Sequence, residues 1–193
     1  MKKYLQTVLF TTLLLTTTHV FSQSLVEQIK ARAGEINELK ALLNNPDSSV
    51  RIAAIDVMQN SDDIAMREMG FSAGINSSDE AVVAITVRNK FKEIKNFNIQ
   101  LKLPADSSEE AVKSFNKMGG QIGYVIVTYD PATATFVNDT TYDGRDKTST
   151  ISGRVLQLNS TYTNGTFILN EELLFVGELS FGATKFAGQI QIF

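Results

Sequence analysis

The spacing of hydrophobic residues changes its period near the middle of the chain. In the first part, apolar side chains recur every three or four positions, as at Leu25 and Ile29, which predicts amphipathic helices. Further on they alternate with polar residues from Phe97, which is the period of a half-buried strand. The sequence therefore predicts an α+β protein, with a helical region over residues 23–95 followed by an antiparallel β-domain over residues 96–193.

Polar breaks divide the helical region into four expected helices. The first runs over about Ser24–Leu43, and the second begins after Asp47-Ser48-Ser49 and ends at the break at Asn60. The third runs over about Ile64–Ala73 and ends at Gly74, and the fourth begins after Ser77-Ser78-Asp79 and ends at about Phe91. The second of these helices carries apolar residues on two faces, one including Val57 and Met58 and the other Ile55. A helix that is apolar on two faces has to be covered on two sides, which predicts a stacked helical array.

An internal sequence repeat supports the stacking of helices. Asp47-Ser48-Ser49-Val50 matches Asp79-Glu80-Ala81-Val82 at an offset of 32 residues. The segment Pro46-Asp47-x-x-Val50-Arg51-x-Ala53-Ala54-Ile55 resembles a HEAT-type repeat, in which Asp-x-x-Val-Arg opens the second helix. The resemblance covers about residues 46–91, with Val83 in place of the Arg in the second copy, and implies stacked helical hairpins but no particular function. Because solenoids usually need three or more repeats, we expect this region to pack on the β-domain or on a partner.

The β-domain is predicted to be a meander with one inserted helix. After the first strand, Ser107-Ser108-Glu109-Glu110 begins the helix and Gly119-Gly120 ends it. The remaining strands are expected at Ile122–Tyr129, Ala134–Val137, Thr148–Leu158, Thr166–Leu169, Leu173–Phe181 and Phe186–Phe193, with Asn164-Gly165 as a hairpin turn. Such a meander forms a barrel or a strongly curved sheet. Its many Phe and Tyr residues are interpreted as core, with an aromatic-lined ligand pocket as the alternative.

Residues 1–22 have the pattern of a signal peptide. Lys2 and Lys3 precede an apolar stretch, and the pattern predicts cleavage between Ser22 and Gln23. The stretch is too short and too rich in Thr for a membrane anchor, so no stable membrane insertion is expected. The opening is typical of bacterial export, which predicts a periplasmic or secreted protein.

The amino-acid composition limits the catalytic and metal-binding groups that this protein could use. The chain has no Cys, and its one His, His19, lies in the predicted signal peptide. The exported chain would therefore lack imidazole and thiolate nucleophiles, His or Cys metal ligands, and disulfides. Loss of Lys2 and Lys3 changes the formal net charge from −3 to −5. An acidic chain without a basic cluster argues against nucleic acid as a partner.

Two polar stretches are candidate ligand sites. Asp139, Asp143 and Asp146 could offer oxygen ligands to Ca²⁺, although Thr150 stands where an EF-hand loop has its bidentate Glu. The alternative is a polar hairpin loop held by Asx turns. No other cofactor is predicted. The second stretch is a basic run, which would be either an anion-binding patch or solvated charge at a helix C-terminus. Its members are Arg88, Lys90, Lys92 and Lys95.

These observations predict a function without catalysis. The leading hypothesis is a non-enzymatic protein–protein interaction module of the periplasm or extracellular space, whose helical layer docks a protein or its own β-domain. The alternative is a β-domain that binds a small ligand or a carbohydrate. An enzyme is not predicted, because no pair of carboxylates is tied into one cleft by the sequence.

Overall fold

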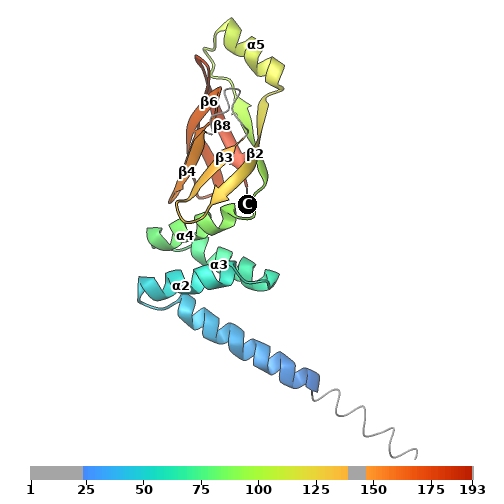
Figure 1. The fold of residues 1–193 in the computed structure, drawn as a ribbon, viewed down its shortest axis with the longest axis vertical. Helices are drawn as coiled ribbons and strands as arrows, with labels where there is room; N and C mark the ends of the chain where they lie inside the picture. The colour runs from blue at the N-terminus through green and yellow to red at the C-terminus, as the bar shows by residue number, and fades with distance from the viewer. Residues whose placement is uncertain (1–23, 139–146, 193) are drawn as a thin grey trace, which may run out of the picture. The chain divides into compact units, whose positions relative to one another are not determined.

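The computed structural model describes residues 24–138 and 147–192 and divides the chain into two compact units, Met1–Pro46 and Asp47–Phe193. The described part of the first unit is a single helix over residues 24–43, drawn in blue in Figure 1. The second unit holds three short helices and a closed antiparallel β-barrel with one inserted helix. The predicted α+β class is confirmed.

Three short helices open the second unit, and an aspartate caps each of them. They are α2 (Ser48–Gln59), α3 (Ile64–Ile75) and α4 (Glu80–Phe91). The carboxylates of Asp47, Asp63 and Asp79 accept hydrogen bonds from backbone N–H groups two residues further on. Each bond satisfies a donor that the first turn of a helix leaves open. The sequence repeat with its 32-residue offset thus relates the starts of α2 and α4, while the HEAT-type resemblance stays a prediction.

Helix α3 continues through Gly74, where the sequence predicted its end. A Cβ at Gly74 would lie 1.9 Å from Oγ1 of Thr86 in α4, and a Cβ at Gly70 would lie 2.8 Å from Cβ of Met58 in α2. Glycine is therefore needed here because α3 packs closely against both neighbouring helices, and its role as a helix terminator does not apply.

Both apolar faces predicted for α2 are covered in part. Ile55 on one face and Met58 on the other are buried, whereas Val57, on the face of Met58, is 67% exposed. The second unit itself therefore leaves part of the apolar surface of α2 open to solvent.

Eight antiparallel strands form the barrel. They are β1 (Asn96–Lys102), β2 (Gln121–Asp130), β3 (Thr135–Asn138), β4 (Thr148–Ser152), β5 (Val155–Asn159), β6 (Thr163–Leu169), β7 (Leu174–Phe181) and β8 (Thr184–Gln191). Each strand pairs with the next along the chain, and β8 returns to β1 with Ile190 opposite Ile99. Of the two forms that the sequence left open, the closed barrel is the one found.

Two predicted strand ends are wrong. The stretch 148–158, expected as one strand, is β4 and β5 joined by a turn in which Gly153 has a φ of 58°. Asn164-Gly165, expected as a hairpin turn, lies inside β6, where Gly165 pairs with Leu158. A Cβ at Gly165 would lie 2.5 Å from a carbonyl oxygen of β7, so this glycine allows strands to approach instead of turning the chain.

Aromatic side chains fill the barrel interior, which confirms the core interpretation for most of them. The fully buried large residues include Phe136, Phe167, Phe175, Phe186, Leu179 and Ile190. The buried hydroxyl groups of Tyr124 and Thr163 satisfy each other at 2.5 Å. Among the described aromatic residues of the barrel, Tyr162 and Phe181 are the exceptions, with 61% and 37% of their surface exposed.

Helices cover both ends of the barrel (Figure 1). At one end, α4 inserts Phe91 among the barrel aromatics, 5.9 Å from the ring of Phe136 and 6.2 Å from that of Phe175. At the other end, the inserted helix α5 (Glu109–Met118) packs Phe115 against the core. The helical layer and the barrel therefore share one hydrophobic core.

Candidate functional site

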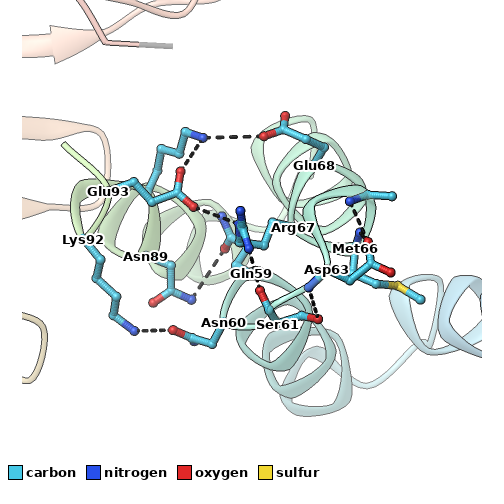
Figure 2. Close-up of polar contacts among 12 residues, drawn as sticks. Gln59, Asn60, Ser61, Asp63, Met66, Arg67, Glu68, Asn89, Lys92 and Glu93 are labelled. Carbon is cyan, nitrogen blue, oxygen red and sulfur yellow. Dashed lines mark hydrogen bonds and ion pairs between the residues drawn. The ribbon is translucent and has the colours of Figure 1, made fainter.

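An open polar cleft of about 470 Å³ lies where α2 ends, α3 begins and α4 ends (Figure 2). Its lining residues are Gln59, Asn60, Ser61, Arg67, Glu68, Asn89, Lys92 and Glu93. All of these side chains are polar, so the cleft suits a ligand that forms hydrogen bonds or ion pairs.

Two buried amide side chains, Gln59 and Asn89, form the inner part of the cleft, with exposed fractions of 9% and 5%. Nε2 of Gln59 donates to the carbonyl oxygen of Thr86 at 3.2 Å. Nδ2 of Asn89 donates to Oδ1 of Asp56 at 2.9 Å and to Oε1 of Gln59 at 3.5 Å. These bonds orient the Asn89 amide and leave its Oδ1 buried without a hydrogen-bond partner. Because a buried acceptor without a partner carries a desolvation penalty, Oδ1 is suited to accept a hydrogen bond from a ligand.

Charged side chains at the rim of the cleft neutralise one another (Figure 2). Nε of Arg67 lies 3.3 Å from Oε1 of Glu93, and Nζ of Lys90 lies 2.7 Å from Oε2 of the same carboxylate. Lys90 also faces Glu68 at 3.7 Å. Lys92 donates to Oδ1 of Asn60 at 2.7 Å. The basic run predicted from the sequence is therefore balanced by acidic neighbours at Lys90, and its anion-patch interpretation gains no support here.

Helix termini bring the cleft residues together. Asn60 is the C-cap of α2 and Lys92 is the C-cap of α4, at the same 32-residue offset as the two N-cap aspartates. Arg67 lies in the first turn of α3, where its Nη1 donates to the carbonyl oxygen of Ser61 at 2.9 Å. The close packing of α3 against both neighbours holds these three helix ends around one depression.

A second depression, of about 560 Å³, lies on the outer face of the barrel. Its lining residues are Thr148, Thr150, Gln157, Leu158, Asn159, Asn164, Gly165, Thr166, Glu178 and Ser180. Hydroxyl and amide groups of four neighbouring strands, β4 to β7, predominate there. Such groups can bind a neutral, hydroxyl-rich ligand.

Several predicted features fall outside the described residues. They are the calcium ligands Asp139, Asp143 and Asp146 and the signal peptide over residues 1–22. Within residues 24–138 and 147–192, no group of three or more His, Cys, Asp or Glu residues could hold a metal ion. In the same described ranges, none of the helices combines the length and the hydrophobicity that a membrane crossing requires.

No protein-family model matches the chain, and no curated protein or solved structure is significantly similar to it.

Sequence reasoning had not singled out Gln59, Arg67 or Asn89. Among the residues in and around the cleft, the sequence pattern marked Asn60 as a helix break and Lys90 and Lys92 as members of the basic run. The sequence repeat with its 32-residue offset could have indicated part of the cleft, because it aligns the C-terminal ends of α2 and α4 and so pairs Asn60 with Lys92. The burial of Asn89 has no such signal, since it depends on how three helices pack.

Proposed function

We propose that this protein is an exported, non-enzymatic protein–protein interaction module that binds a polar segment of a partner in the α2–α3–α4 cleft. The observation that carries this proposal is the buried Oδ1 of Asn89, which has no hydrogen-bond partner at the inner side of an open cleft. A backbone N–H of an extended segment is the commonest donor that another protein could offer to this oxygen.

The charge distribution supports a protein ligand. Among the residues that line the cleft, Arg67 and Lys92 stand beside Glu68 and Glu93, so positive and negative lining groups are equal in number. The neighbouring Lys90 pairs with both glutamates. A balanced rim favours a segment with mixed or no charge over a simple anion or cation. The mutual pairing of Arg67 and Glu93 at 3.3 Å also suits recognition better than proton transfer, which requires a group poised to change its charge.

The predicted localisation completes the proposal. The signal peptide pattern over residues 1–22 supports binding in the periplasm or outside the cell. Because the barrel interior is filled by its own aromatic residues, the cleft and the outer surfaces are the places where a partner would be met.

Site-specific crosslinking tests the proposal. A photo-crosslinking amino acid is placed at Glu68, on the cleft rim with 63% of its side chain exposed, or at Lys185, an exposed position on β8. We expect a defined protein adduct in the native cell envelope from position 68 and none from position 185. Adducts of equal yield from both positions, or no adduct from position 68, would contradict the proposal.

A second substitution in the same crosslinking chain shows whether the cleft itself is responsible. Asn89→Ala removes the orphan acceptor and should abolish the adduct. Since that change also removes the hydrogen bond to Asp56, Lys92→Glu provides an independent variant, which reverses a rim charge and loses the hydrogen bond to Asn60 but leaves the Asn89 amide in place. The thermal unfolding midpoint confirms that each variant is folded. An adduct that survives both substitutions would place the binding surface elsewhere.

The outer depression of the barrel supports a second candidate function, carbohydrate binding. Its supporting observation is the predominance of hydroxyl and amide groups, among which Oγ1 of Thr150 donates to Oε1 of Gln157 at 3.4 Å. A glycan that binds the native state raises the unfolding midpoint by mass action. We expect a shift at millimolar glycan that Gln157→Ala removes and Glu172→Ala, in the loop between β6 and β7, does not. An empty glycan screen would dismiss this candidate.

A further inference from the structure

The helix over residues 24–43 carries an apolar seam with the spacing of a coiled coil. Seam positions follow one another at alternating intervals of four and three residues, which is the pattern of heptad positions d and a. The d positions are Leu25, Arg32 and Leu39, and the a positions are Ile29, Ile36 and Leu43. Arg32 is the one polar member of the seam.

Burial along the helix follows the same seam. The partly buried residues are Arg32, Ile36, Leu39 and Leu43, and the remaining residues of the helix are exposed. Leu25 and Ile29, at the start of the seam, are 57% and 60% exposed. The described part of this unit is the helix alone, so no other described element of its own unit covers the seam.

The opposite side of the helix suits exposure to water. Heptad positions b, c and f hold small, polar or charged residues, namely Ser24, Glu27, Lys30, Ala31, Gly34, Asn37, Glu38 and Ala41. A Cβ at Gly34 would meet no atom within 4 Å. The helix-weakening glycine therefore lies away from the seam, where it does not interrupt packing between helices.

We infer that two copies of this chain associate through the helix over residues 24–43 as a parallel coiled coil. Ile29 and Ile36 at a positions with Leu25 and Leu39 at d positions are the combination that favours parallel dimers. This inference concerns the first compact unit and does not rest on the cleft proposed above.

Charge complementarity supports a second copy of the same chain as the partner. Glu35 falls at position g and Lys40 at the following e position. In a parallel dimer, the g residue of one helix faces the next e residue of the other, so Glu35 of each copy meets Lys40 of its partner. Arg32 is directed along its own helix, with Nη1 2.6 Å from Oε2 of Glu35. This contact partly neutralises the two guanidinium groups that a d position brings near each other.

Charge reversal at the interface gives the decisive test. Glu35→Lys and Lys40→Glu each place like charges across the seam twice per dimer. Each variant alone should therefore weaken self-association by roughly tenfold in sedimentation equilibrium of the purified chain. An equimolar mixture of the two variants should recover most of the affinity that either variant alone loses, because both interhelical pairs become complementary again. Glu38→Lys and Lys30→Glu make the same charge changes on the outer side and should have no effect.

The absence of cysteine from the sequence permits a test of orientation. In a parallel dimer, Leu25 faces Leu25 of the other copy across the seam, so L25C chains should form an interchain disulfide under mild oxidation. In an antiparallel dimer, Leu25 would face the region of Leu43 instead, and only a mixture of L25C and L43C chains would crosslink. Formation of the second product alone would overturn the parallel arrangement.

Other outcomes would overturn the inference as a whole. A chain that stays monomeric at all accessible concentrations would do so. A dimer that tolerates Ile36→Asp at the centre of the seam would show that the interface lies elsewhere. Because these variants lie outside the second unit, their failure would leave the crosslinking result at Glu68 unaffected, and the two proposals can fail separately.

Discussion

At the residue scale, Asp79 joins two helices. Its Oδ1 accepts the backbone N–H of Ala81 at 3.0 Å and so caps α4. Its Oδ2 accepts the hydroxyl of Ser48 and lies 2.5 Å from Nη2 of Arg51, both in α2. The hydrogen bond from Ser48, helped by the Ala81 N–H and Arg51, holds the pKa of the Asp79 carboxyl below its usual value.

This lowered pKa predicts a pH dependence of stability. The contribution of the ionised carboxylate is complete above the unfolded-state pKa, near 4, and is lost as pH falls through the lower folded-state value. Asp79→Asn keeps a capping side chain but loses the charge. We therefore expect the variant to be less stable than the unchanged chain at pH 7, with the difference shrinking below about pH 4. Denaturant unfolding across this range measures it, with exposed Asp62→Asn as the control. A difference that does not depend on pH would contradict the assignment.

Tyr129 links the barrel to α4 in a similar way. Its hydroxyl donates to the carbonyl oxygen of Arg88 at 2.7 Å, and burial raises the pKa of Tyr129 to about 12. Because the neutral phenol is the favoured form, its contribution to stability is present below about pH 10 and is lost as pH rises towards 12.

We expect Tyr129→Phe to lower the free energy of unfolding by about 1 kcal/mol at pH 7, through loss of this hydrogen bond. Ultraviolet titration of the folded chain should also lose the phenol transition near pH 12 that Tyr129 contributes. Tyr162→Phe, at an exposed position, serves as the control and should change stability little. Equal effects of the two substitutions would show that the contact to Arg88 contributes nothing.

At the element scale, glycines decide how closely neighbours pack. Gly74 faces Thr86, and Gly165 faces the backbone of β7. A Cβ at Gly165 would lie 2.5 Å from a carbonyl oxygen of that strand. The sequence pattern interpreted both glycines as breaks in secondary structure, because glycine also tolerates positive φ. Local sequence cannot separate these two uses, since the atom that excludes a side chain comes from another element.

Gly74→Ala should therefore destabilise the helical layer by about 1–3 kcal/mol, since Oγ1 of Thr86 has to move. Thr86→Ala removes the nearest obstructing atom, and the double variant should recover part of the loss in a double-mutant cycle. Gly34→Ala is the matched control. It meets open space and should favour its helix by about 1 kcal/mol. Simple additivity of the Gly74 and Thr86 changes would contradict the proposed close contact.

At the scale of the whole molecule, Phe91 joins the helical layer to the barrel. It is fully buried, and its ring packs edge-on against that of Phe175. Val83 and Val87 of the same helix belong to this core as well. The second compact unit should therefore unfold in one cooperative step rather than as separate helical and β parts.

Phe91→Ala is expected to lower the stability of this unit by about 3–5 kcal/mol, through lost burial and a cavity at the barrel end. Far-ultraviolet circular dichroism of the helices and near-ultraviolet signals of the barrel tyrosines should shift together. Val57→Ala, at an exposed site on α2, is the control and should leave both signals nearly unchanged. Two separate transitions in the Phe91 variant would show that the layers are independent.

The sequence by itself determined the local elements of this protein. The three-to-four and two-residue periods located the helices and most strands, and Asp47 and Asp79 located two helix starts. Each of these features depends on residues a few positions apart, which interact through the backbone geometry of one element.

Only the tertiary structure decided barrel closure and the candidate site. Closure requires β8 to return to β1, and the cleft requires Asn89 to reach Asp56 across the helical layer at 2.9 Å. The spacing of residues along the chain predicts neither contact, because both contacts depend on how whole helices and strands pack. In the sequence, Asn89 cannot be distinguished from an ordinary polar surface residue. It becomes a candidate binding residue only because the fold buries its Oδ1 without a hydrogen-bond partner.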